Sequence, residues 1–358
     1  MAAIKRYGRW MRNFYYETPV DRVVFLGPNG DEWERPTFLH RPARLTYDDH
    51  GYEHLEIDGD PVMAVRFTPV SVGMYRYRAM AGDDLLEEGG FRCEDSDHPG
   101  FVVISGQDPR YFATTEGGSF CPIGLCMAGP PRYALSRGSA HFETSDDWAT
   151  LGAAEYERWF RLLSENGGNF ARIWLSHPYF NVETEIAGEL DLAAFTRLDA
   201  VIEHARTYGI RLKLCFDHFR TFEPGSFFYK DLHHPEDGRT PEDVDEWLTS
   251  PEWRDLWLKK VQVYLDRYGT DPVVMAWELW NEQNAMKADW ENVLEWTKDM
   301  LIELKKRSPQ HLVVNSLGSF DTKDAISRYR ELTINAMDFQ QVHRYLDQGA
   351  PWEICRED

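Results

Sequence analysis

The chain has 358 residues, of which 42% are hydrophobic and 28% are charged, a composition typical of a folded protein with a large core. Its 60 Asp and Glu residues outnumber 39 Lys and Arg residues, and the formal net charge of -21 disfavours nucleic acid and anionic membranes as partners. No apolar run approaches the ~20 residues of a membrane span, and residues 1–8 lack the apolar core of a secretory signal, so we expect a cytoplasmic protein, or a secreted one if the amino terminus is incomplete.

Short alternating segments separated by turn-forming residues characterise the first 110 residues. In residues 73–79, Tyr75 and Tyr77 alternate with Arg76 and Arg78, as in a strand with one buried face. Further strands are expected over residues 23–26, 33–38, 62–67, 89–93 and 101–105. Strands of this length and spacing predict a small antiparallel, immunoglobulin-like β-sandwich domain over residues 1–110.

Apolar strands alternate with amphipathic helices in the remaining residues, 111–358. Strands are expected at 120–126, 170–175, 211–216, 273–279, 312–316 and 339–343, and helices at 156–163, 195–208, 251–268, 289–307 and 322–332. Buried strands that alternate with helices predict βαβ units around a parallel sheet. Because there is no glycine-rich nucleotide-binding turn, an eight-fold (β/α)8 TIM barrel is favoured over a doubly wound sheet.

The strand count falls short of a complete barrel. We find about six strand–helix periods where an eight-fold barrel has eight. A truncated barrel domain over residues 111–358, incomplete at its carboxyl end, is the favoured explanation. The alternative is an open barrel, which would expose sheet edges to water.

The residue types most suited to catalysis follow the fourth strand of this second region, in the segment Trp-Glu-Leu-Trp-Asn-Glu of residues 277–282. Asn281 and Glu282 would lie at the carboxyl end of that strand, where barrel enzymes place their active sites. A carboxyl group near the apolar Trp280 would have a raised pKa and would be able to protonate a glycosidic oxygen. Asn281 would hold a sugar 2-hydroxyl. The alternative for an isolated Asn-Glu pair is an ordinary helix amino terminus.

The same segment, after a fourth strand–helix period, resembles clan A glycoside hydrolases, particularly glycoside hydrolase family 5. The resemblance implies a retaining β-glycosidase of cellulase type that acts on β-linked poly- or oligosaccharides. It also implies that Glu282 is the general acid/base. The match spans residues 120–346.

Three further segments carry this resemblance. Arg172, in the second strand of the region, matches the arginine that supports the nucleophile in that family. His218, after the third strand, matches a histidine that often contacts substrate. His343 and Tyr345 match a His-x-Tyr segment after the sixth strand, whose tyrosine typically contacts the nucleophile.

The amino-terminal region has a resemblance of its own. Residues 7–10, 25–30 and 69–77 are similar to the β-sandwich of unassigned function that precedes many cellulase-like barrels, and residues 108–112 are similar to the joint between the two domains. The resemblance implies a domain that packs on the barrel or touches the polysaccharide.

One element of the family pattern is missing. A retaining glycosidase needs a second carboxylate roughly 5–5.5 Å from the first, and the family supplies it after strand seven. The last carboxylates, Glu353, Glu357 and Asp358, lie in a tail without a strand pattern. We therefore expect the nucleophile to lie beyond residue 358 and this chain to have little hydrolase activity by itself.

Several residues have two interpretations. Trp174 and Trp280 are expected to form a sugar-stacking platform, with core packing as the alternative. Asp217 is expected to orient His218 or to bind a hydroxyl. The segment between residues 218 and 249 is expected to shape the cleft through aromatic side chains, namely Phe222, Phe227, Phe228 and Tyr229.

Other function classes are less well supported. A non-catalytic carbohydrate-binding protein, or an inactive glycosidase fragment, is the main alternative. The sequence has no His-x-His strand and no cysteine–histidine cluster, so neither a metal site nor a cofactor is expected. A carbohydrate is the expected partner, and the sequence does not determine the oligomeric state.

Overall fold

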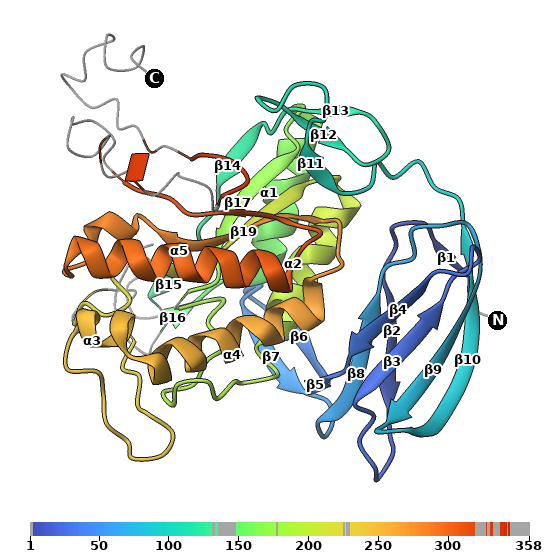
Figure 1. The fold of residues 1–358 in the computed structure, drawn as a ribbon, viewed down its shortest axis with the longest axis horizontal. Coiled ribbons are helices and arrows are strands. Elements are labelled where there is room, and N and C mark those ends of the chain that lie inside the picture. Colours follow the sequence, from blue (N-terminus) through green and yellow to red (C-terminus); the bar gives the residue numbers. More distant parts are fainter. Residues whose placement is uncertain are drawn as a thin grey trace.

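A computed structural model describes residues 3–130, 133–134, 148–176, 178–224, 226, 230–318, 327, 330–331, 337–341 and 343. Figure 1 shows a β-rich region formed by the first strands, on the right, beside a region of mixed strands and helices on the left. Among the described helices, none is both long and apolar enough to cross a membrane.

The amino-terminal region is built from two main sheets. One sheet has the strand order β1 (Ala3–Lys5), β10 (Asp84–Glu94), β9 (Gly73–Ala81), β3 (Arg22–Leu26) and β4 (Glu32–Pro36). The other has the order β2 (Trp10–Phe14), β8 (Val62–Phe67) and β5 (Phe38–His40). The immunoglobulin-like topology expected from the sequence stays a prediction.

Aromatic rings from both sheets form the core between them. The Phe25 ring stacks on Phe67 with centroids 4.1 Å apart, and the Tyr75 ring stacks on Phe91 at 5.1 Å. Tyr75 is fully buried on one face of β9, and the arginines that alternate with it are exposed. The alternation predicted for this strand is therefore confirmed, and the two sheets form a sandwich.

A hairpin that the sequence analysis did not anticipate leaves this sandwich. It consists of β6 (Ala43–Tyr47) and β7 (Glu53–Ile57). The buried Glu53 carboxylate accepts hydrogen bonds from the Tyr179 hydroxyl at 2.9 Å and the Ala153 backbone N–H at 2.7 Å. It also pairs with Arg197 at 3.1 Å. The hairpin thus joins the sandwich to the helical region.

A three-stranded antiparallel sheet, β11 (Val102–Ile104), β12 (Phe112–Thr114) and β13 (Ser119–Phe120), follows the sandwich. Val102 packs in one cluster with Met275 and Leu312, which belong to the parallel sheet. The expected domain boundary near residue 110 lies between β11 and β12, which pair with each other. Division of the chain into residues 1–110 and 111–358 stays a prediction.

Five parallel strands form the main sheet of the second region. In sheet order they are β14 (Gly124–Cys126), β17 (Phe170–Trp174), β18 (Arg211–His218), β19 (Val274–Asn281) and β20 (Leu312–Val314). The helices are α1 (Gly152–Glu165), α2 (Phe195–Thr207), α3 (Val244–Thr249), α4 (Pro251–Tyr268) and α5 (Trp290–Arg307). A short antiparallel pair, β15 (Tyr133–Ala134) and β16 (Trp148–Ala149), forms a separate two-stranded sheet.

Strand order and chain order coincide in this sheet. Each crossover from β14 to β20 therefore moves one position in the same direction. A doubly wound sheet would need a reversal of that order, so the expectation of a singly wound β/α arrangement is confirmed for these five strands. Closure into an eight-fold barrel, and its truncation, stay predictions.

The expected sixth strand is not formed in the part of residues 339–343 that the structure describes. The edge of β20 is occupied instead by Asp338, whose backbone N–H donates to Val313 O at 3.0 Å and whose carboxylate accepts from Val313 N–H at 2.7 Å. The Val313 N–H thus donates to the Asp338 carboxylate, where in a continued sheet it would donate to a backbone carbonyl of the next strand. The helix expected at 322–332 lies mostly outside the described residues.

Charged side chains hold the sandwich against α2 and α4. Arg66, on β8, is 4% exposed, and its guanidinium donates to the Asp199 carboxylate of α2 at 2.7 Å. The Tyr268 hydroxyl of α4 donates to the same carboxylate at 2.9 Å. Arg267 reaches back to the Leu39 carbonyl at 2.6 Å. Burial opposes ionisation of Asp199, but Arg66 lowers its pKa well below the ordinary range.

We predict that Asp199→Asn strongly destabilises the protein, because it leaves the buried Arg66 guanidinium without a counter-charge. The free energy of unfolding in urea should fall by about 3 kcal/mol. Glu56→Gln, which breaks the exposed pair with Arg44 on the β6–β7 hairpin, is the matched control and should have no measurable effect. Equal effects of the two substitutions would contradict this account of the interface.

Candidate active site

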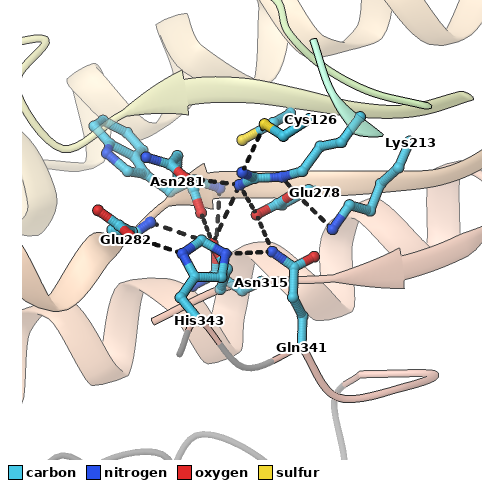
Figure 2. A network of polar contacts seen from close by, with 12 residues as sticks. Cys126, Lys213, Glu278, Asn281, Glu282, Asn315, Gln341 and His343 are labelled. Atoms are coloured by element: carbon cyan, nitrogen blue, oxygen red, sulfur yellow. Dashed lines mark hydrogen bonds and ion pairs between the residues drawn. The ribbon is translucent and has the colours of Figure 1, made fainter. Parts of the chain in front are cut away.

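Three charged side chains meet on one side of the parallel sheet. Arg172 comes from β17, Lys213 from β18 and Glu278 from β19. Arg172 binds Glu278 in a two-pronged contact, Nε to Oε2 at 2.8 Å and Nη2 to Oε1 at 2.6 Å. Lys213 Nζ lies 3.2 Å from Oε2 of the same carboxylate. Glu278 has no exposed surface, so two cations compensate one buried anion (Figure 2).

These contacts keep Glu278 ionised. Burial alone would raise its pKa, but the opposing charges of Arg172 and Lys213 lower the pKa to about 2. Lys213 shows the complementary effect, because its burial lowers its pKa although Glu278 opposes the shift. A carboxylate bound in this way serves as a fixed scaffold charge rather than as a proton donor.

Asn281, the last residue of β19, is oriented by the same arginine. Arg172 Nη2 donates to Asn281 Oδ1 at 2.7 Å, and Asn281 is only 2% exposed. Because the amide oxygen accepts from a cation, the amide nitrogen is directed away from Arg172. The arrangement fixes Asn281 as a hydrogen-bond donor next to Glu282.

Glu282 follows directly and adopts a left-handed backbone conformation, with φ 55° and ψ 48°. It is one of two non-glycine residues with positive φ among the described residues. Such a conformation is costly for a residue with a side chain and is concentrated at functional sites. The Glu282 carboxylate is 14% exposed, and its Oε1 lies 2.7 Å from His343 Nδ1.

Gln341 connects this contact to the buried cluster, as Figure 2 shows. Gln341 Nε2 lies 2.6 Å from His343 Nε2 and 3.5 Å from Glu278 Oε1. An amide nitrogen only donates, so Nε2 of the imidazole accepts from Gln341. Nδ1 therefore carries the hydrogen and donates a hydrogen bond to Glu282 Oε1. His343 therefore holds the Glu282 carboxylate from the side of the Arg172–Glu278 pair.

His218, at the end of β18, lies beside two aromatic rings. Its imidazole centroid is 4.8 Å from Trp174 and 4.5 Å from Phe219. Burial lowers the pKa of His218 to about 3, although Glu282 opposes the shift. The Arg172 guanidinium in turn lies 5.5 Å from the Trp174 ring. His218 and Trp174 are thus brought to the cluster, as the sequence analysis expected.

The structure does not bring two other predicted residues to the site. Trp280 is fully buried, with its ring 5.3 Å from Trp247 of α3 and 5.8 Å from Trp296 of α5, so it is a core residue and not a sugar platform. Asp217 accepts from Trp257 Nε1 at 2.8 Å and pairs with Lys260 at 3.2 Å, both on α4. It therefore neither orients His218 nor faces the cluster.

Other expected residues lie outside the described part of the chain. These are Tyr345 and the loop aromatics Phe227, Phe228 and Tyr229. Phe222 is described, and its ring packs 4.9 Å from Trp247.

The sequence analysis missed the charged scaffold itself. Glu278 lies inside the motif that drew attention to Glu282, and Lys213 interrupts an apolar strand. A charged residue inside a strand that is otherwise buried needs a partner, and this signal would have pointed to both. In the part of the chain that the structure describes, no cluster of three or more metal-ligating side chains occurs.

Comparison with known proteins places this site in a family context. No family model matches the chain. The chain is 27% identical over 220 residues to mannan endo-1,4-beta-mannosidase 7 of Arabidopsis thaliana, covering 54% of this chain and 50% of that protein. It is 29% identical over 184 residues to mannan endo-1,4-beta-mannosidase 1 of Solanum lycopersicum, covering 45% of this chain and 46% of that protein.

A similar fold is found in the crystal structure of a protein named as a glycoside hydrolase from Bacteroides vulgatus ATCC 8482. The superposition has a TM-score of 0.54 at 18% identity and covers 89% of this chain and 56% of that one. The chain spans about half the length of the curated relatives it matches. Its resemblance to glycoside hydrolase family 5 of clan A, expected from residues 277–282, is confirmed by these relatives.

We predict that His218 makes the protein sensitive to acid. Between pH 6.5 and about 3 the unfolded chain binds a proton at this position that the folded protein does not, so stability falls as the pH falls. His218→Gln should reduce the slope of unfolding free energy against pH by about 1.4 kcal/mol per pH unit near pH 5. The slope is measured by urea unfolding at a series of pH values.

Asn166→Ala, at the exposed end of α1, removes no titratable group and is the control for this experiment, which should keep the wild-type slope. If His218→Gln also leaves the slope unchanged, the imidazole is not held neutral by its burial.

Proposed function

We propose that this site is the acid/base half of a retaining glycoside hydrolase that acts on β-linked mannan. In the first step a second carboxylate attacks the anomeric carbon, the glycosidic C–O bond breaks, and the leaving oxygen takes the proton of the Glu282 carboxyl group and departs as an alcohol. In the second step Glu282 takes a proton from water, whose oxygen attacks the anomeric carbon. The bond to the second carboxylate breaks, which releases the sugar and restores the free carboxylate and the protonated Glu282.

One observation carries this proposal. The Glu282 carboxylate lies at the carboxyl end of a parallel strand, within 2.7 Å of His343 and directly after an asparagine whose amide is oriented by Arg172. A donor fixed beside a carboxyl group suits a sugar 2-hydroxyl, a contact that strengthens as positive charge develops on the ring. The choice of mannan is supported by the relatives, which are named as mannan endo-1,4-beta-mannosidases.

We propose that the nucleophile is not among the residues of this chain, as expected from the sequence. Glu278 is the other carboxylate in the cluster, where it contacts Arg172. It is held by two bonds from Arg172 and by Lys213, and attack on a sugar would require it to leave both cations. Because Glu278 is held by both cations, a second candidate function is a carbohydrate-binding protein without hydrolase activity.

The test of the proposal combines binding with hydrolysis. Isothermal titration calorimetry with mannohexaose should show binding to the 358-residue chain. Asn281→Ala should weaken that binding by about ten-fold or more, because a sugar hydroxyl loses its partner. Glu282→Gln keeps the shape of the side chain and should change it by less than about three-fold. Asn166→Ala, at the exposed end of α1, is the matched control.

Hydrolysis tests the assignment of the nucleophile, because background activity is expected if this chain does not supply one. We expect the 358-residue chain to release aryl alcohol from an aryl β-mannoside at background rate. Robust hydrolysis that Glu282→Gln abolishes would contradict the assignment of the nucleophile and support the acid/base role. No binding of mannohexaose would contradict the proposed substrate class.

A further inference from the structure

Residues 315–318, which follow β20, form hydrogen bonds to residues on both sides of Glu282. Asn315 Oδ1 accepts from the Trp280 backbone N–H at 3.0 Å, before Glu282. Ser316 Oγ accepts from the Glu282 N–H itself at 3.2 Å. The Ser316 hydroxyl also donates to the Trp280 carbonyl at 3.2 Å. Three backbone groups around Glu282, the Trp280 N–H, the Trp280 carbonyl and the Glu282 N–H, are thus held by side chains from the neighbouring strand end.

Further hydrogen bonds are formed after Glu282, where a short 3-10 helix η1 (Gln283–Ala285) begins. The Gln283 N–H donates to the Ser316 carbonyl at 3.3 Å. Asn284 and Gly318 exchange two hydrogen bonds, Nδ2 to the glycine carbonyl at 3.1 Å and the glycine N–H to Oδ1 at 2.8 Å.

The buried side-chain amides of Asn315 and Gln283 connect these hydrogen bonds to α5. Asn315 Nδ2 donates to Gln283 Oε1 at 2.6 Å, and the Thr297 hydroxyl of α5 donates to the same oxygen at 2.6 Å. Asn315 is 2% exposed and Gln283 is fully buried. These buried hydrogen bonds restrain the residues that they join, and Gln283 Nε2 is the one amide atom of the pair without a partner among the described residues. The network provides the surrounding structure that an unfavourable left-handed residue needs to persist.

Gly318 has a second role, which follows from its lack of a side chain. A Cβ atom at this position would lie 2.6 Å from Cδ, 2.7 Å from Cγ and 2.9 Å from Oε1 of Glu282. Its backbone is outside the left-handed region, so an alanine is compatible with the main chain. An alanine at this position would therefore displace the Glu282 carboxylate from the place that it occupies.

We infer that residues 315–318 are a positioning element for Glu282, and that Gly318 sets the position of its carboxylate by providing the space into which it fits. The inference rests on the proposed acid/base role of Glu282 for its functional meaning. Physically, a side chain at position 318 would compete with the Glu282 side chain for the same space. Gly318 is a positioning residue and does not itself contact substrate.

The test is a double-mutant cycle measured by thermal unfolding. Gly318→Ala should lower Tm by about 2–4 °C in the wild-type background, because the added methyl group collides with the glutamate. In the Glu282→Ala background the atoms it would meet are gone, and the same substitution should change Tm by less than about 1 °C. Gly106→Ala is the matched control, since nothing lies within 4 Å of a Cβ there.

A spectroscopic measurement reports the displacement itself. In protein labelled with 13C at the glutamate carboxyl carbons, Glu282→Gln assigns the Glu282 resonance by its disappearance. Gly318→Ala should shift that resonance, and Gly106→Ala should leave it in place. A structural role of Gly318 elsewhere in the loop would not move this signal.

Each outcome decides the inference. An equal loss of Tm in both backgrounds, or an unmoved Glu282 resonance, would overturn it. If Gly318→Ala fails to fold alone but folds together with Glu282→Ala, the coupling is supported; failure to fold in both backgrounds contradicts it. Because neither readout uses hydrolysis or mannohexaose, its failure is distinguishable from failure of the proposed function.

Discussion

A carboxylate without solvent contact imposes the main constraint on this structure. Glu278 lies on β19, the fourth of the five strands of the parallel sheet, and an isolated ion at this buried position would be strongly unfavourable. Arg172 and Lys213, from the two preceding strands, compensate its charge. Removal of either cation would leave an uncompensated buried charge, which is far more costly than replacement of the whole group by apolar residues. The relative positions of β17, β18 and β19 are therefore fixed by electrostatics as well as by backbone pairing.

The candidate catalytic groups are arranged around this charge cluster. Nη2 of Arg172 donates to both the Glu278 carboxylate and the Asn281 amide oxygen, so the buried ion pair and the residue proposed to bind a sugar hydroxyl share one partner. Gln341 and His343 extend the contacts to Glu282 from one side, and the strand-end residues Asn315 and Ser316 hold its backbone from another. A carboxyl group held from several directions is pre-organised, which is what proton transfer at a fixed distance requires.

Much of this arrangement could be predicted from sequence because strands and motifs are local. The runs that contain β18 and β19 are apolar and bounded by helices, so their existence and order were evident. Glu282 could be singled out because it ends such a run. Trp280 and Asp217 could not be placed, because their partners, among them Trp296 and Lys260, come from helices whose packing no local pattern reveals. The role of Gly318 depends on a contact between two strand ends, which spacing along the chain does not show.

The β6–β7 hairpin has a consequence for how the chain acquires its structure. Glu53 finds its partners at Ala153, Tyr179 and Arg197, which lie 100, 126 and 144 residues further along the chain. During synthesis this carboxylate must remain hydrated until all three have left the ribosome. Contacts of such high sequence separation slow folding. The hairpin therefore completes its docking only after the chain has been translated past Arg197, in the second region.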